Sequence, residues 1–304
     1  MNILITGGAG FVPSSTAEKL LEDKSNTVVL VDNFLTGIQQ NIPSHENCHF
    51  YRCDVNRWDE ISPIFDKFDF DYVFHYAAVV GVKRTLAHPI LVLDDIQGIH
   101  NILELCKNHN VKRVFYSSSS EVYGEPVHLP QNEETTPLNS RLPYAVVKNV
   151  GESYFRSYYQ EFGLEYTIFR FFNTYGPKQS QDFVMSRFIK SALNNEDITI
   201  YGDGIQTRTF CYIDDNTEAC LNTMKSNKYA NDVFNIGNDK IMTIKNLAEV
   251  IIDLTNSKSK IIHLAPLPEG DMTRRQPDIS KMRDLLNRDL TSLEDGIKII
   301  LNQL

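Results

Sequence analysis

Short continuous runs of hydrophobic residues alternate along the first half of the chain with longer segments that carry apolar residues at helical spacing. Continuous runs rich in Val, Ile, Tyr and Phe are typical of strands that are buried on both faces. Such runs occur at 1–5, 27–32, 49–54, 72–75, 113–116 and 166–171. The segments with helical spacing are 58–67, 90–110 and 144–162. Because buried strands joined by helices form parallel sheets with helices on both faces, we expect an α/β architecture.

The pattern changes near residue 174. Loops rich in Gly, Pro, Gln and Asp separate shorter elements, which we expect at 183–194, 198–201, 210–213 and 214–225. This alternation of loops and short elements predicts a second lobe rather than further strands of the same sheet. The expected division is 1–173 and 174–304, and because no linker separates the two parts, their boundary is soft and interleaved.

A glycine-rich turn, Thr6-Gly7-Gly8-Ala9-Gly10, joins the first strand to a helix. Small residues let the backbone approach the phosphates of a dinucleotide, and the free N–H groups at the helix start attract their negative charge. The second strand ends about twenty residues later in Asp32, a carboxylate that suits the ribose hydroxyls of NAD and repels the extra phosphate of NADP. No Arg or Lys occurs in 33–36. The order of these features predicts an NAD site on a Rossmann-type doubly wound parallel sheet, with a smaller α/β substrate-binding lobe.

Pro13 stands where this pattern has a third glycine, which normally allows close packing of the helix against the strand. Proline can occupy the start of a helix, because its missing N–H would be unpaired in the first turn anyway. We therefore expect a local repacking that leaves the cofactor site working. The alternative is weakened or displaced cofactor binding.

Composition narrows the class of protein. With 304 residues, 42% hydrophobic and 23% charged, the chain has the make-up of an ordinary globular protein. Its net charge of −9 argues against nucleic acid and anionic membranes as partners. The five cysteines form no metal-like cluster, so no metal is expected, and their odd number suits a reduced, cytoplasmic protein. Because the first residues form a predicted strand without a preceding basic stretch, we expect no signal peptide, and no apolar run approaches membrane-spanning length.

Candidate chemistry lies in two segments. Tyr144 and Lys148 are spaced as neighbours on one helix face, where the ammonium would favour the phenolate and so lower the tyrosine pKa. The serine-rich loop at 117–124 follows a predicted strand, at the edge of the sheet where ligands of such folds bind. Either feature alone is weak evidence. Together with the dinucleotide turn, in this order, they indicate a dehydrogenase-like active site.

The chain resembles the extended short-chain dehydrogenase/reductase family, in its branch of nucleotide-sugar epimerases, dehydratases and decarboxylases. The segments that carry the resemblance span nearly the whole chain: 6–10, 31–33, 54–55, 75–78, 119–124, Tyr144 with Lys148, 173–177, 201–204, Arg208 and 275–278. The resemblance implies a retained NAD that oxidises a sugar hydroxyl at C4 and later returns the hydride. It also implies a nucleotide-diphosphate sugar substrate, and a homodimer formed through the helices near 90–110 and 144–162.

The resemblance also implies roles for single residues. Tyr144 would be the base for the C4 hydroxyl, Ser119 would hydrogen-bond that oxygen, and Lys148 would hold the nicotinamide ribose, with Glu121 completing the catalytic set. The cofactor would be held by Gly7, Gly10, Phe11, Val12, Asp32, Asn33, Asp54, Val55, Ala77, Ala78, Tyr144 and Lys148. The substrate would be bound by Ser119, Ser120, Asn173, Arg208 and Arg275, with the guanidinium groups facing the diphosphate.

Two further positions depart from the family pattern. Asp95 stands where the family has Asn, before Ile96-Gln97-Gly98, and Val147 replaces the usual Ser before the lysine. Neither change removes a catalytic group, but each alters local hydrogen bonding.

The position two residues after Ser119 discriminates between reactions. It is usually Ser or Thr in the 4-epimerases that this chain resembles, and Glu in decarboxylases and 4,6-dehydratases. Here it is Glu121, and Ser120 stands where dTDP-glucose dehydratases have an acidic Asp. Together with Arg275 in 275–278, this is the pattern of UDP-glucuronate decarboxylases. The sequence therefore favours a decarboxylase-like lyase.

Other features favour different reactions. The loop at 176–183 is shorter than in typical decarboxylases, and 77–81 and 143–145 are more like those of a UDP-sugar 4-epimerase. GDP-mannose-type dehydratases also use Ser-Glu, so a nucleotide-sugar dehydratase is a further alternative. A catalytically inactive nucleotide-binding homologue is the alternative from another class. The intact Tyr144, Lys148, Ser119 and Glu121 argue against it.

Overall fold

The computed structural model describes residues 1–266 and 274–303. Its largest sheet is built from β1 (Asn2–Thr6), β2 (Thr27–Asp32), β3 (Cys48–Arg52), β4 (Tyr72–His75), β5 (Arg113–Ser119), β6 (Glu165–Phe171) and β11 (Asp232–Ile236). The strand order is β11-β6-β5-β4-β1-β2-β3. The pairs β1–β2, β1–β4, β2–β3 and β4–β5 are parallel. This is the predicted Rossmann-type α/β sheet, and the strands predicted at 27–32 and 72–75 are confirmed with the same bounds.

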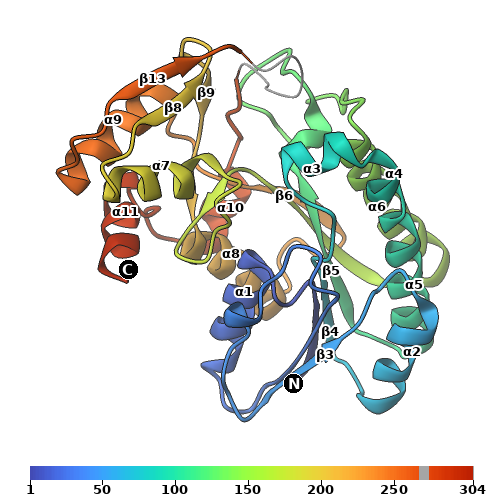
Figure 1. Cartoon of the computed structure of the whole chain (residues 1–304). Helices are drawn as coiled ribbons and strands as arrows, with labels where there is room; N and C mark the ends of the chain where they lie inside the picture. Colours follow the sequence, from blue (N-terminus) through green and yellow to red (C-terminus); the bar gives the residue numbers. More distant parts are fainter. Residues whose placement is uncertain (267–273, 304) are drawn as a thin grey trace. The chain divides into compact units, whose positions relative to one another are not determined.

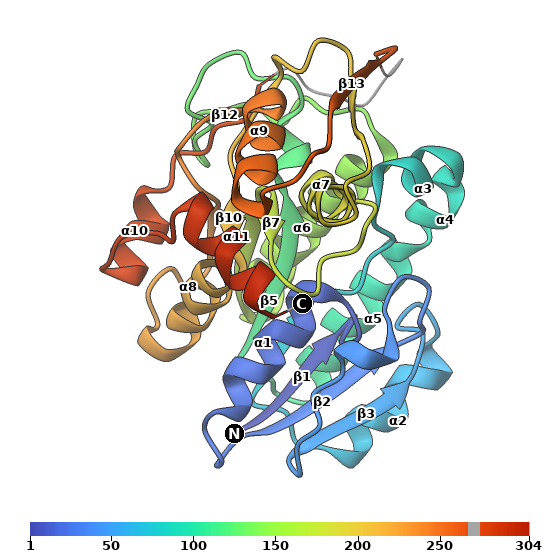
Figure 2. The same cartoon turned by 60° about the vertical axis from the view of Figure 1, so that its left-hand side comes forward.

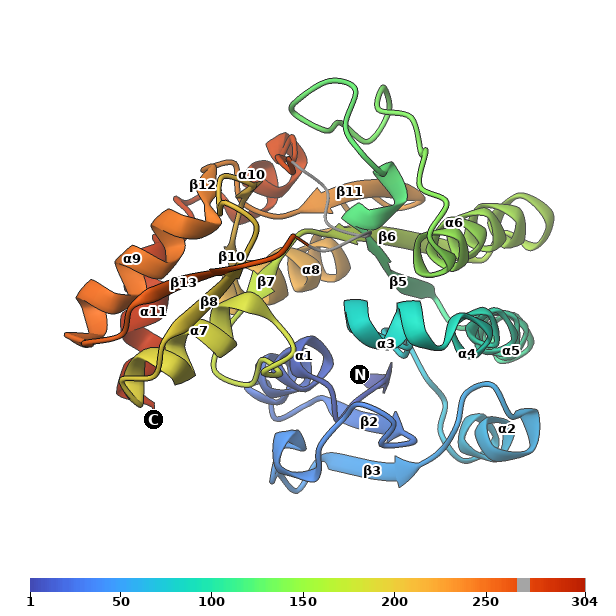
Figure 3. The same cartoon turned by 45° about the horizontal axis from the view of Figure 1, so that its top comes forward.

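Helices cover both faces of this sheet. They are α1 (Phe11–Leu21), α2 (Trp58–Lys67), α3 (Val82–Ala87), α4 (Pro89–Leu93), α5 (Asp95–Asn108), α6 (Pro143–Phe162) and α8 (Ile213–Ser226). The helices α2, α5 and α6 lie on one face, whereas α1 and the part of α8 from Thr217 onward lie on the other (Figures 1 and 3). With both faces covered, every residue of β5 is buried, as a continuous apolar run requires. Two short 3₁₀ helices, Gln39–Asn41 and Ser120–Tyr123, lie in loops that follow β2 and β5.

One predicted helix is divided in two. The segment predicted as a single helix over 90–110 forms α4 and α5, which meet at Asp94. At this joint one backbone hydrogen bond spans three residues instead of four, because the Gln97 N–H donates to the Asp94 carbonyl. Val92 and Ile99, on either side of the joint, are both buried. The apolar periodicity therefore runs through the joint and does not reveal it.

The chain forms two compact units. The first comprises 1–122, 140–170 and 217–234, and the second comprises 123–139, 171–216 and 235–304. Residues 217–234 lie beyond the expected boundary at 173 and 174, yet they belong to the first unit. Their last strand, β11, pairs with β6, and the Asn231 N–H donates to the Tyr166 carbonyl beside that pair. Pairing with β11 covers an edge of β6 that would otherwise expose unpaired backbone groups.

The second unit is built from short strands and helices. Its strand pairs are β7 (Thr174–Tyr175) with β10 (Cys211–Tyr212), β8 (Ile198–Tyr201) with β13 (Ile261–Leu264), and β9 (Thr207–Arg208) with β12 (Met242–Thr243). Its helices are α7 (Val184–Leu193), α9 (Ile244–Thr255), α10 (Ser280–Leu286) and α11 (Leu293–Asn302). Helices α7 and α9 pack on each other and on β8, and α11 packs on α9 (Figure 2).

Candidate active site

The glycine-rich turn packs tightly against the strands beside it. Gly7 has a φ of 71°, and a Cβ atom at this position would lie 3.0 Å from the backbone of Ala77. A Cβ atom on Gly8 would lie 2.6 Å from the Leu30 Cβ. Helix α1 follows at once, with Gly10 as its N-cap, and the first N–H groups of a helix have no partner within it. The glycines therefore let the turn pack against β2 and the loop after β4, and the N–H groups at the start of α1 are those that would meet a dinucleotide pyrophosphate.

Pro13 is the third residue of α1 and is buried. An N–H at this position would have no acceptor within the helix, so proline removes no helical hydrogen bond. The helical bonding begins one residue later, where the Ser14 N–H donates to the Gly10 carbonyl over 3.2 Å. The proline Cγ would lie 3.3 Å from a Cβ on Gly10, so the ring packs against the turn. These contacts support the expectation that Pro13 is accommodated by local packing.

Asp32 is bonded to the glycine-rich turn. Its Oδ2 accepts from the Ala9 N–H at 3.0 Å and its Oδ1 from the Phe34 N–H at 2.7 Å. Burial raises the pKa of the Asp32 carboxyl, and these two N–H groups act against that rise. The neighbouring Asn33 donates to Asp54 Oδ2 over 3.3 Å. The structure thus brings together Asp32, Asn33 and Asp54, which are predicted to contact the adenosine half of NAD.

A buried threonine ties the turn to β4. Thr6 Oγ1 accepts from the N–H groups of Tyr76 and Ala77, each at 3.0 Å. Its own proton is therefore left for His75 Nδ1, which lies 2.9 Å away. Burial, with the nearby charge of Lys148, lowers the pKa of His75 to about 3, so the ring is neutral and carries its proton on Nε2. These contacts were not predicted from the sequence, and we call the cluster the Thr6 clamp (Thr6, His75, Tyr76 and Ala77).

Tyr144 and Lys148 lie on the first turns of α6, as their spacing predicts. Only 3% of Lys148 is exposed. Its Nζ lies 5.7 Å from the centre of the Tyr144 ring and donates to Ser117 Oγ over 3.3 Å. Burial lowers the pKa of Lys148 to about 8, and the charge of Asp95 acts in the opposite direction. The predicted phenol–ammonium pair therefore lies on one face of α6, with the ammonium buried and the Tyr144 ring partly buried.

The serine loop is anchored to α6 from behind. Ser119 ends β5, and its Oγ accepts from the Glu121 N–H at 3.2 Å. Ser118 donates to Glu152 Oε1 over 2.7 Å, and two nitrogens of Arg170 bind the same carboxylate at 2.8 and 2.7 Å. Although burial alone would raise the pKa of Glu152, the hydrogen bond and charge of Arg170 bring it below its usual range. This buried pair holds the loop that carries Ser119, Ser120 and Glu121.

The residues predicted to face the diphosphate lie in the second unit. Asn173 follows β6 and donates to the Thr209 carbonyl over 3.1 Å, which places it beside β9 and Arg208. Arg208 and Arg275 are both buried. A guanidinium group is the natural bidentate partner of a diphosphate. Their role in binding stays a prediction.

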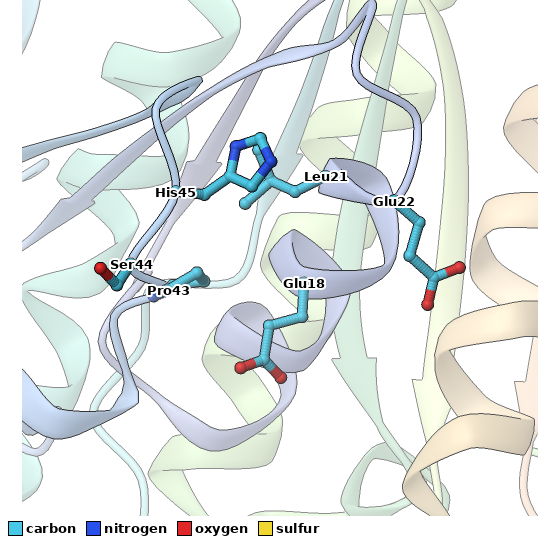
Figure 4. Close-up of a pocket in the computed structure, with 6 residues that line it drawn as sticks. All are labelled: Glu18, Leu21, Glu22, Pro43, Ser44 and His45. Atoms are coloured by element: carbon cyan, nitrogen blue, oxygen red, sulfur yellow. The ribbon is translucent and has the colours of Figure 1, made fainter.

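Three further features of the described residues lie outside the predicted site. In the described ranges 1–266 and 274–303, no group of three His, Cys, Asp or Glu side chains could hold a metal ion. None of the helices described there is long and apolar enough to cross a membrane. A surface pocket between the end of α1 and 43–45 is lined by Glu18, Leu21, Glu22, Pro43, Ser44 and His45 (Figure 4). None of these six is a predicted site residue.

The fold, the dinucleotide turn and the Tyr144–Lys148 pair on α6 define an NAD-dependent enzyme of the short-chain dehydrogenase/reductase class. A family model narrows the class of enzyme to one family. The family model "NAD dependent epimerase/dehydratase family" matches residues 3–237, and the chain belongs to this family.

Known relatives are named for more than one reaction. Over 305 residues the chain is 36% identical to a putative UDP-glucose 4-epimerase of Methanocaldococcus jannaschii, covering 99% of this chain and 97% of the relative. Over 306 residues it is 36% identical to UDP-glucuronic acid decarboxylase 1 of Danio rerio, covering 97% and 70%. Among solved structures, the UDP-glucose 4-epimerase of Thermotoga maritima with UDP-glucose is similar, with a TM-score of 0.93, 32% identity and coverage of 99% and 98%. The chain is therefore an NAD-dependent nucleotide-sugar enzyme of the epimerase/dehydratase type.

Proposed function

We propose that this enzyme converts a nucleotide-diphosphate sugar through a transient 4-keto intermediate, and that its reaction is the decarboxylation of UDP-glucuronate. The observation that supports this proposal is the position of Glu121, two residues after Ser119. It lies on the 3₁₀ helix directly after Ser119 and carries a buried carboxyl oxygen. A carboxylate at this point can transfer a proton, which a Ser or Thr would do only poorly.

The residues of the first unit fit the cofactor. The turn from Gly7 to Val12 would bind the pyrophosphate, and Asp32 with Asn33 the adenine ribose. Lys148 would hold the nicotinamide ribose. When bound, NAD would accept a hydride from C4 of the sugar and later return it.

The first step needs a base beside the C4 hydroxyl. Tyr144 would take the proton from the C4 hydroxyl. The O–H bond of the sugar would break as the hydrogen on C4 leaves as a hydride for the nicotinamide. The Lys148 ammonium favours the phenolate form that this step requires. Ser119 would donate a hydrogen bond to the same oxygen.

The second step follows from the 4-ketone. With a ketone at C4, the C6 carboxylate is part of a β-keto acid, so the C5–C6 bond can break and release carbon dioxide. The electron pair of that bond forms an enolate across C4 and C5, and a proton must then be added at C5. Glu121 would serve this stage, by transferring the proton or by orienting the ring.

A UDP-sugar 4-epimerase is the second candidate. The relatives from M. jannaschii and T. maritima and the short loop at 176–183 favour it. In that reaction the hydride returns to the other face of C4, and Glu121 would only position the substrate.

The test is product analysis with UDP-glucuronate, UDP-glucose and a GDP-sugar by mass spectrometry. Decarboxylation predicts a UDP-pentose, lighter than UDP-glucuronate by the mass of carbon dioxide. Loss of water from any of these sugars would instead show a dehydratase. A product of unchanged mass with inverted C4 would show an epimerase and overturn the decarboxylase proposal.

We also propose a homodimer formed through the helices predicted at 90–110 and 144–162, which are α4, α5 and α6. Ile90 is 70% exposed, and Leu91 and Leu93 on α4 and Val146 and Phe162 on α6 are also exposed. Large apolar side chains exposed on such helices can serve as a contact surface. A monomer mass in solution at micromolar concentration would contradict the dimer.

We place the enzyme in the cytoplasm, because all five cysteines are free thiols. Recovery of the native protein from an oxidising compartment would contradict this.

A further inference from the structure

The hydroxyl group of Ser117 joins three elements of the first unit. Ser117 lies on β5, two residues before Ser119, and only 8% of it is exposed. Its Oγ accepts from Lys148 Nζ on α6 over 3.3 Å and donates to the His75 carbonyl at the end of β4 over 3.4 Å. Because the single proton of the hydroxyl is used on the carbonyl, a lone pair is left for the ammonium. Ser117, which is not among the predicted catalytic or binding residues, is therefore oriented as an acceptor for Lys148.

The other close neighbours of the Lys148 ammonium are aromatic. Its Nζ lies 5.0 Å from the centre of the Tyr116 ring and 5.7 Å from the centre of the Tyr144 ring. A ring face attracts a cation but does not fix the direction of its N–H groups as an oxygen does. Across residues 1–266 and 274–303, Ser117 Oγ is the one hydrogen-bond acceptor of this ammonium. The direction in which the charged end of a flexible side chain lies therefore depends on Ser117.

The groups around the ammonium are themselves held in place. The Tyr116 ring stacks on Phe155, with the ring centres 4.7 Å apart. Helix α6 can approach this ring because it carries Gly151, where a Cβ atom would overlap the Tyr116 hydroxyl. The His75 side chain is bound by Thr6, whose Oγ1 lies 2.9 Å from Nδ1. Ser117 thus holds Lys148 against elements that have little freedom to move.

The number of donors on Lys148 indicates what this contact achieves. An ammonium group has three N–H donors, and one of them is used on Ser117. We propose that Ser117 is a positioning residue, whose hydroxyl holds the Lys148 ammonium so that its two remaining N–H groups meet the two hydroxyls of the nicotinamide ribose. The proposal rests on the role proposed for Lys148 with NAD, and not on which nucleotide sugar is converted.

The variant Ser117→Ala removes the acceptor and leaves the ammonium without a fixed direction. NAD should then bind more weakly, because Lys148 no longer presents its donors to the nicotinamide ribose. ADP is the matched probe, since it lacks that ribose and keeps the adenosine and the pyrophosphate. We expect the affinity for NAD to fall about tenfold, the scale of one hydrogen bond to a charged group, and the affinity for ADP to stay unchanged.

Two further variants separate the hydroxyl from the substitution itself. Ser117→Thr keeps a hydroxyl on the same carbon, so it should bind NAD like the wild type. Ser157→Ala makes the same change as Ser117→Ala on an exposed serine of α6, and it should leave the affinities for both NAD and ADP unchanged.

Calorimetric titration of the cofactor-free protein with NAD and with ADP tests the proposal. An unchanged NAD affinity in Ser117→Ala would overturn it. Equal losses of NAD and ADP affinity would also overturn it, because they would show a general distortion of the nucleotide site. So would a loss in Ser117→Thr as large as that in Ser117→Ala, since the hydroxyl would then not be responsible. If no nucleotide sugar is converted, the proposed function fails while these titrations still decide the role of Ser117.

Discussion

The Thr6 clamp offers a prediction whose magnitude follows from its contacts. Thr6 is fully buried, and its hydroxyl serves Tyr76 N–H, Ala77 N–H and His75 Nδ1. Thr6→Val keeps the shape of the side chain but leaves two buried polar groups, His75 Nδ1 and the Tyr76 N–H, and the part-buried Ala77 N–H without this partner. Each such group costs about 1–3 kcal/mol, so we expect the free energy of unfolding to fall by about 3 kcal/mol or more. Thr6→Ser keeps the hydroxyl and loses one methyl group, which costs about 1 kcal/mol.

Urea unfolding of the NAD-free protein measures this difference, provided that the slope with urea is the same in both variants. The clamp also sets the separation of Gly7 and Ala77 at the cofactor turn, so NAD binding should weaken about tenfold, or about 1.4 kcal/mol, in Thr6→Val and little in Thr6→Ser. If the two variants unfold within about 0.5 kcal/mol of each other, well below the loss expected from unpaired buried groups, the reasoning is wrong.

Two predictions concern the cofactor site. NAD should bind more tightly than NADP, because Asp32 repels a 2′-phosphate; a titration that shows tighter NADP binding would contradict this. Pro13→Gly should change NAD affinity by less than about tenfold, or about 1.4 kcal/mol, since Pro13 removes no helical hydrogen bond. A larger gain in affinity would show that the proline impairs the site.

The parts of the fold that the sequence predicted are those decided by local pattern. Strands β2 and β4 are continuous apolar runs buried on both faces, so their ends coincide with the ends of the runs. The place of β11 at the edge of the sheet was not predicted, because it depends on pairing with β6, which is distant in the sequence. The joint at Asp94 was missed because side-chain periodicity continues across it.

In the candidate site, too, the features set by local sequence were predicted and the contacts between distant segments were not. Tyr144 and Lys148 were found because residues four apart meet on any helix. The contacts of Thr6 with His75 and of Ser118 with Glu152 join separate elements, and no spacing in the sequence reports which strands and helices become neighbours. One signal was available: Thr6 directly follows the first predicted strand and His75 ends another, and the structure pairs them in register.

The variant Glu121→Gln tests the central claim most directly, in a turnover assay with UDP-glucuronate. The amide preserves shape but cannot accept a proton. We predict that NAD still binds and that net turnover falls by a factor on the order of 10²–10⁴, the usual contribution of a general acid–base group. Tyr144→Phe serves as the reference, because it should abolish hydride transfer altogether. Near-normal turnover in Glu121→Gln would contradict the account, since Glu121 would then only position the substrate, as in an epimerase.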